Sequence, residues 1–283
     1  MFAAVMITPQ PSRLTGRIGQ MLRRPRPSVR RLRRDAASYW LITAPSTGRG
    51  VDWELVGDCA GRQRRRLVVD PSIELPEDAG IARFEPNEFP FLLAFNAAKS
   101  ALQHSRVELW KRTVGVVDPE GRCQNQVMEL LSYATCVKVC TQRPERYEAF
   151  CRQMLALYGA PVLVCRDEEP LNDCLLVVSA APRPLGLDQN LPVIGAKSGG
   201  AAPLELWDFA CELPGEYQGF APEGMDPTYF LAALYELGHR KALGKTIPTA
   251  CRMGGRKVAL GELGLVIQAR SGAIARWQGQ FGY

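Results

Sequence analysis

The stretch from Thr113 to Pro182 constrains the fold more than any other part of the chain. It alternates short apolar segments with amphipathic ones, and the apolar segments do not alternate regularly between apolar and polar residues. Strands of this kind are buried on both faces, which is typical of parallel strands covered by helices. We therefore expect an α/β protein with a parallel central sheet and right-handed crossovers. The predicted strands are 113–117, 136–140, 161–165 and 174–178.

One helix in this stretch carries a full set of sequence signals. Apolar residues from Tyr147 to Tyr158 recur at the spacing of one helix face. Pro144 suits the first turn, where its missing N–H costs little, and Gly159 suits a left-handed C-terminal cap. A second helix is expected over residues 122–133, between the first two strands.

The flanking sequence predicts an N-terminal α/β segment (1–105), a central parallel-sheet domain (106–197), and a Pro/Gly-rich connection to C-terminal helices (198–283). In the last part, Asp226 is a good N-cap for a helix over 227–237. The other predicted strands are 2–7, 38–43 and 66–69, and the other predicted helices are 13–22, 51–65, 85–103 and 258–269.

Positive charge is concentrated near the start of the chain. The net charge is +6, and residues 1–66 hold fourteen arginines and four acidic residues. The densest run, from Arg23 to Arg34, is expected to be a solvated linker. The alternative is contact with nucleic acid through phosphates, although the run lacks the interleaved aromatic residues that single-strand binders use for stacking.

Two composition features narrow the function classes. No apolar run approaches the roughly 20 residues that cross a bilayer, and the start makes a poor signal peptide, so we expect a cytoplasmic protein without a membrane partner. Two histidines and no Cys-x-x-Cys motif predict core thiols in place of a metal site. The nine cysteines are Cys59, Cys123, Cys136, Cys140, Cys151, Cys165, Cys174, Cys211 and Cys251.

Three features at the ends of the predicted strands resemble the Rossmann-like NADP-binding domains of the shikimate-dehydrogenase type. Strand 113–117 leads through a turn into a helix, strand 136–140 ends in the sequence 141–146, and the segment 172–182 is a later strand ending in small residues. The resemblance covers about a quarter of the chain. It implies a Rossmann-like sheet that binds NADP, with the adenosine 2′-phosphate near the end of the second strand. The implied cofactor-binding residues are Gly121, Arg122, Thr141, Arg143, Arg146 and Ser179.

The turn after the first strand departs from that family. Only Gly121 stands where the family has several glycines, and Asp118 and Glu120 place negative charge where a pyrophosphate would lie. No catalytic set is recognisable, so no catalytic residue is assigned. The main hypothesis is a binding module for a small anionic ligand or a protein partner. The alternatives are an NADP-linked oxidoreductase with a degenerate fingerprint, and nucleic-acid binding through Arg23 to Arg34.

Overall fold

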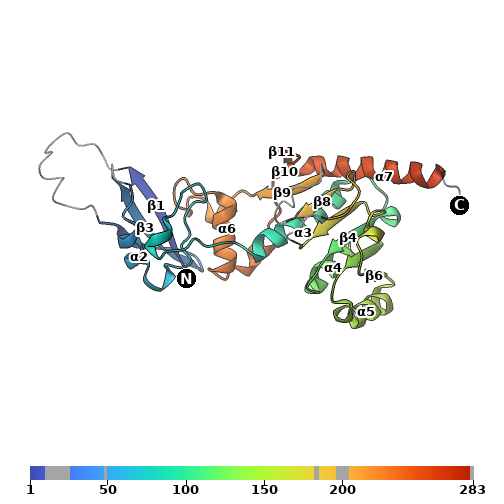
Figure 1. The fold of residues 1–283 in the computed structure, drawn as a ribbon, viewed down its shortest axis with the longest axis horizontal. Coiled ribbons are helices and arrows are strands. Elements are labelled where there is room, and N and C mark those ends of the chain that lie inside the picture. Colours follow the sequence, from blue (N-terminus) through green and yellow to red (C-terminus); the bar gives the residue numbers. More distant parts are fainter. Residues whose placement is uncertain (10–25, 48–49, 182–184, 196–203, 281–283) are drawn as a thin grey trace, which may run out of the picture. The chain divides into compact units, whose positions relative to one another are not determined.

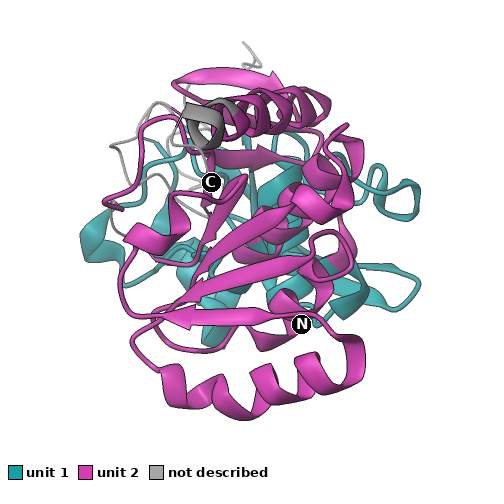
Figure 2. Cartoon of the chain, turned by 90° about the vertical axis from the view of Figure 1, so that its right-hand side faces the viewer, with its two compact units in different colours: residues 1–89, 212–244 teal, residues 90–211, 245–283 magenta. Residues whose placement is uncertain are grey.

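A computed structural model of the chain describes residues 1–9, 26–47, 50–181, 185–195 and 204–280. The chain forms two compact units (Figures 1 and 2). The first unit comprises residues 1–89 and 212–244, and the second comprises residues 90–211 and 245–283. The predicted boundaries at residues 105 and 197 stay a prediction about independently folding domains. The predicted helix 13–22 lies outside the described residues.

The second unit is built on an eight-stranded sheet in the order β11-β10-β9-β8-β7-β4-β5-β6. The six strands from β4 to β9 are all parallel, and numbered along the chain they run 3-2-1-4-5-6 across the sheet. This is the Rossmann order, with its switch point between β4 and β7. The predicted parallel α/β sheet is confirmed. The strands are β4 (Thr113–Val117), β5 (Cys136–Cys140), β6 (Val162–Cys165), β7 (Leu176–Ser179), β8 (Val193–Gly195), β9 (Glu205–Ala210), β10 (Ala250–Met253) and β11 (Arg256–Ala259).

The helices of this unit follow the sequence signals closely in the centre and less closely at the end. After β5, the 3₁₀ turn η4 (Pro144–Arg146) leads into α5 (Glu148–Tyr158), which ends at Gly159 in the left-handed conformation as predicted. α4 (Gln124–Leu130) is shorter than predicted. Figure 1 shows α4 and α5 at the β4–β6 end of the sheet and α7 (Leu263–Gln280) along the β9–β11 end.

The C-terminal prediction was wrong in one respect. The helix expected from residue 258 begins at Leu263, because residues 256–259 pair with β10 as the antiparallel strand β11. A backbone N–H or C=O group that is hydrogen-bonded to a neighbouring strand is not free to form the first turn of a helix. Strands β8 to β11 were not predicted as strands, so the sheet is twice as wide as the sequence suggested.

The first unit contains a three-stranded sheet in the order β1-β3-β2. β1 (Ala3–Pro9) runs parallel to β3 (Ala37–Ser46), and β2 (Ser28–Arg34) pairs antiparallel with β3. The expectation of a solvated linker was therefore wrong for residues 28–34, which form an edge strand; residues 23–25 lie outside the described chain.

Aromatic side chains hold this unit together across a long gap in the sequence. Tyr39 on β3 is buried, and its hydroxyl donates to the Phe220 carbonyl at 2.6 Å. The Tyr39 ring stacks on Phe2 and meets Phe230 edge to face. Phe230 lies on α6 (Pro227–Glu236), whose first turn is capped by Asp226 as predicted.

Two other predictions for the first unit need correction. The helix expected over 51–65 is α2 (Trp53–Ala60), which ends because Gly61 has a φ of +54°. Residues 66–69 form isolated bridges to β1 and to Arg83 in place of a strand. The predicted helix 85–103 is confirmed as α3 (Glu88–His104), most of which belongs to the second unit.

Five of the nine cysteines are buried, which is the position expected of core thiols. None of the helices in the described part of the chain combines the length and hydropathy that crossing a bilayer requires.

Candidate functional site

The turn that follows β4 is organised around a buried carboxylate. Asp118 is 1% exposed, and its backbone N–H donates to the Cys140 carbonyl at 2.9 Å. One carboxylate oxygen accepts from the Cys123 backbone N–H at 2.8 Å and from the Tyr147 hydroxyl at 2.7 Å. The Rossmann fold usually places a pyrophosphate at this turn. Here the Asp118 carboxylate already accepts the hydrogen bond of the Cys123 amide.

The two groups that surround Asp118 are held in their protonated forms. Burial raises the pKa of the Tyr147 phenol, and the hydrogen bond to Asp118 and its negative charge raise that pKa further. Burial and then the Asp118 charge also raise the pKa of the Cys123 thiol. These shifts favour the protonated Tyr147 phenol, which donates to Asp118, and disfavour the nucleophilic thiolate form of Cys123.

Gly121 brings the β4 turn into contact with the segment after β5. Its φ is +66°, and a Cβ there would lie 2.8 Å from Arg146 Cδ and 3.2 Å from Arg143 Cβ. The Arg146 guanidinium donates to the Glu120 carbonyl at 3.0 Å, and the Gln124 side chain donates to the Arg146 carbonyl. The structure thus places Gly121, Arg143 and Arg146 together at the carboxyl ends of β4 and β5.

The arginines at this edge are exposed and differ in their partners. Arg122 forms a 3.6 Å ion pair with Glu120, and both side chains are mostly exposed. An exposed pair of this kind contributes little. Within the described residues, the Arg143 guanidinium contacts no acceptor. Arg143 is therefore the cation at this edge that is available to a ligand.

The two predicted site residues that carry hydroxyl groups, Thr141 and Ser179, accept hydrogen bonds from backbone amides two residues further along the chain. Thr141 is 1% exposed, and its Oγ1 accepts from the Arg143 backbone N–H at 3.0 Å. Ser179 is opposite Val117, at the end of β7 beside the switch point. Its Oγ accepts from the Ala181 backbone N–H at 3.1 Å. Both residues shape the edge, and a role of any of the six predicted residues in cofactor binding stays a prediction.

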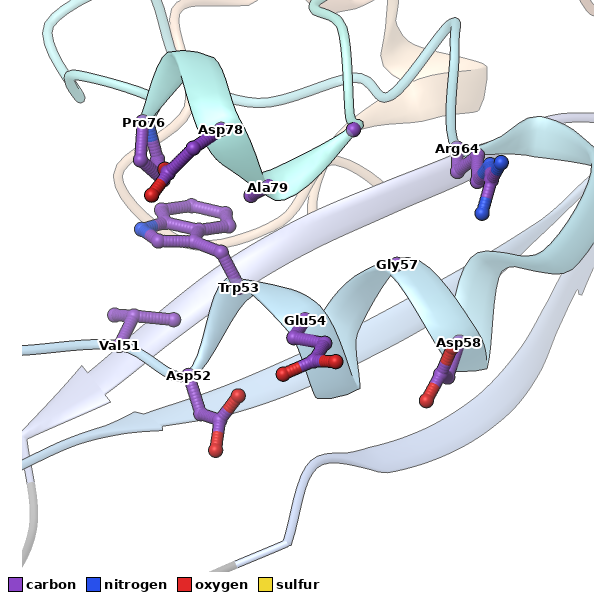
Figure 3. A pocket seen from close by; sticks show the side chains of 11 residues that line it. Val51, Asp52, Trp53, Glu54, Gly57, Asp58, Arg64, Pro76, Asp78 and Ala79 are labelled. Carbon is purple, nitrogen blue, oxygen red and sulfur yellow. The ribbon is translucent and has the colours of Figure 1, made fainter.

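Two cavities lined by described residues lie away from this edge. A pocket of about 570 Å³ in the first unit lies beside α2, and the Trp53 side chain projects from α2 toward the segment that carries Pro76 and Asp78 (Figure 3). Its carboxylates come from Asp52, Glu54, Asp58 and Asp78, and its guanidinium comes from Arg64. One of these carboxylates, on Asp52, caps α2 by accepting from the Leu55 N–H at 3.2 Å. No sequence motif marks this pocket.

A second pocket, of about 360 Å³, lies in the second unit between α3 and α4. Lys99 and Glu129 form an ion pair there, and the Asn96 side chain donates to the Thr246 carbonyl at 2.8 Å. Lys99 and Glu129 are paired with each other, Asn96 is hydrogen-bonded to Thr246, and none of these residues belongs to the predicted site.

No protein family model and no curated protein sequence matches the chain. Solved structures with distant similarity include L-tryptophan dehydrogenase from Nostoc punctiforme, at 13% identity and a TM-score of 0.33, covering 84% of this chain and 77% of that one. Another is Δ1-pyrroline-2-carboxylate reductase from Thermococcus litoralis, solved with NADH and L-proline, at 13% identity and a TM-score of 0.30, covering 72% of this chain and 70% of that one. A lysine cyclodeaminase is also similar, at 13% identity and a TM-score of 0.27, covering 71% and 63%.

These are distant structural similarities, and the narrower resemblance to the shikimate-dehydrogenase type stays a prediction. Identities and TM-scores this low do not transfer the neighbours' activities. The strand order and the side chains at the sheet edge must therefore support any functional conclusion.

Proposed function

We propose that the second unit binds a phosphate-bearing small molecule at the carboxyl ends of β4 and β5. The observation that carries the proposal is the exposed guanidinium of Arg143, which has no partner among the described residues and lies at the edge where sheets of this order bind ligands. A guanidinium offers a bidentate fork to a phosphate. Arg146 lies with it against Gly121 and adds positive charge.

The position of Asp118 decides where the phosphate lies. Its carboxylate holds the Cys123 amide and accepts from Tyr147, so an anion at that turn would meet a buried negative charge. The phosphate therefore lies outside the turn, on the arginine side chains. The Asp118 carboxylate is engaged by the Cys123 amide and the Tyr147 hydroxyl, and no catalytic set of residues is recognisable at this edge among the described residues, which favours binding without chemistry.

An NADP-linked oxidoreductase is the second candidate, and the strand order favours it. Arg143 follows the second strand of a 3-2-1-4-5-6 sheet, where an arginine accommodates the 2′-phosphate of NADP. The dinucleotide would have to pass the Asp118 turn without the usual contacts between pyrophosphate and backbone amides.

Isothermal titration calorimetry of the full chain with inorganic phosphate, adenosine 2′,5′-bisphosphate, NAD and NADP tests both candidates. We expect the bisphosphate to bind and Arg143→Ala to weaken it at least tenfold, since a hydrogen bond to a charged group contributes about 1.5–3 kcal/mol. Arg152→Ala, an exposed arginine on α5, is the matched control.

The outcomes separate the two candidates. If NADP binds more than tenfold tighter than the bisphosphate and NAD does not bind, the oxidoreductase is favoured over the simple binding module. If no phosphate compound releases or absorbs heat at millimolar concentration, both candidates are wrong.

A further inference from the structure

The arginine-rich strand β2 forms an outer edge of the sheet in the first unit. Among the described strands it pairs only with β3. The described residues 26–35 contain five arginines and one acidic residue, Asp35. An edge strand this basic repels like edges, and it also presents a dense positive charge to a polyanion.

The strand register places an aromatic ring beside these arginines. Arg31 lies directly opposite Trp40 on β3, and Arg33 lies opposite Ser38. Directly opposite residues of an antiparallel pair project to the same face of the sheet. Trp40 and Val29 are each 40% exposed, and Arg31 and Arg33 are exposed. We call these residues the β2–β3 patch: Val29, Arg31, Arg33, Ser38 and Trp40.

On the other face of the same strand, Leu32 and Arg34 are half-buried. Arg34 donates to the Gln218 carbonyl, and its guanidinium lies 5.8 Å from the Phe220 ring centre. Leu32 is opposite the buried Tyr39. The arginines of the patch have no such structural role, because no described residue pairs with Arg31 or Arg33. Their charge therefore has no partner in the part of the chain that the structure describes.

From this arrangement we infer that the β2–β3 patch binds single-stranded nucleic acid. Arg31 and Arg33 pair with successive phosphates, and a base stacks on the Trp40 indole. Single-strand binders combine a basic track with aromatic platforms, because an unpaired base exposes its flat face. The sequence of β2 lacks such an aromatic residue, and the pairing with β3 supplies it. A duplex hides its base faces, and a membrane surface requires charge but no stacking.

Fluorescence anisotropy of the full chain with labelled 15-residue oligouridine and oligothymidine tests this inference. We expect Trp40→Ala to weaken binding roughly tenfold and Trp40→Phe to retain most of it, since each stacked base contributes a similar factor. We expect Arg31→Ser with Arg33→Ser to lower the slope of log affinity against log salt by about 1.4, which is about 0.7 for each phosphate contact. Tighter binding of either oligonucleotide than of a 15-base-pair duplex supports the inference. Tighter binding of oligouridine than of oligothymidine identifies RNA as the partner.

The control is Arg62→Ser with Arg65→Ser, two exposed arginines of the same unit outside the patch. Equal losses in this control and in the patch variant overturn the inference in favour of general electrostatics. Unchanged affinity in Trp40→Ala, or equal affinity for a 15-base-pair duplex, also overturns it. Binding to vesicles with anionic lipid but not to oligonucleotides assigns the patch to a membrane surface. If Trp40→Ala melts without cooperativity, the salt slope of the arginine variant decides alone.

Discussion

Asp118 is the residue that most determines the character of the sheet edge. Its carboxylate accepts hydrogen bonds from the Cys123 N–H and the Tyr147 hydroxyl, and both Asp118 and Tyr147 are buried. We expect Tyr147→Phe to lower the free energy of unfolding by about 1–3 kcal/mol, because a buried acceptor is left with one partner fewer. Urea denaturation measures this, with Tyr158→Phe, 66% exposed, as the control. A loss no larger than that of the control would contradict the importance of this contact.

The buried tyrosines also predict how stability depends on pH. Burial raises the pKa of Tyr39, Tyr147 and Tyr229. Their contribution is complete below the unfolded tyrosine pKa of about 10 and is lost as pH rises toward the higher folded pKa. The free energy of unfolding should fall above pH 10, with a slope about 1.4 kcal/mol per pH unit shallower in Tyr147→Phe. Urea titrations at several alkaline pH values measure the slope, and identical slopes would be inconsistent with a buried phenol.

At the scale of the elements, the contact between β4 and β7 has little free space. Gly115 on β4 is opposite Val177 on β7, and a Cβ at Gly115 would lie 2.7 Å from Val177 Cγ2. We expect Gly115→Ala to destabilise the protein by about 1–3 kcal/mol through overpacking. Adding Val177→Ala should cost less than the sum of the two single changes, which a double-mutant cycle measures. Gly272→Ala, in open space on α7, should instead stabilise by up to about 1 kcal/mol. Additive costs at positions 115 and 177 would refute the close contact.

Elements with strong local signals could be predicted from the sequence. β4 and β5 have the predicted bounds, because uninterrupted apolar runs between turn residues define buried strands. β2 was not predicted because its arginine-rich sequence does not alternate between apolar and polar residues. Its pairing with β3 is what makes it a strand. The hairpin of β10 and β11 did carry a signal. Gly254 and Gly255 both have positive φ, as a two-residue hairpin turn requires.

The site was predictable only in outline. Gly121 and Arg143 lie together because adjacent parallel strands end at the same edge. The hydrogen bond from Tyr147 to Asp118 depends on side-chain packing between residues 29 positions apart in the sequence, which no local pattern encodes.

At the scale of the whole molecule, the first unit is assembled from two separate stretches of sequence. Tyr39 packs on Phe220 and Phe230, which come from the second stretch. We expect a fragment of residues 1–89 alone to lack cooperative unfolding, and the same fragment linked to residues 212–244 to regain it. Near-ultraviolet circular dichroism during thermal melting measures this. Cooperative melting of 1–89 alone would show that the aromatic contacts are dispensable.

Hydrogen–deuterium exchange of the full chain, with and without saturating adenosine 2′,5′-bisphosphate, tests most directly whether the carboxyl edge of β4 and β5 holds the ligand. The predicted result is slower exchange in peptides covering residues 118–123 and 141–147, with no change beside the pocket of α2. Slower exchange at residues 51–58 in place of that edge, or saturation without protection at residues 118–123 and 141–147, would contradict it.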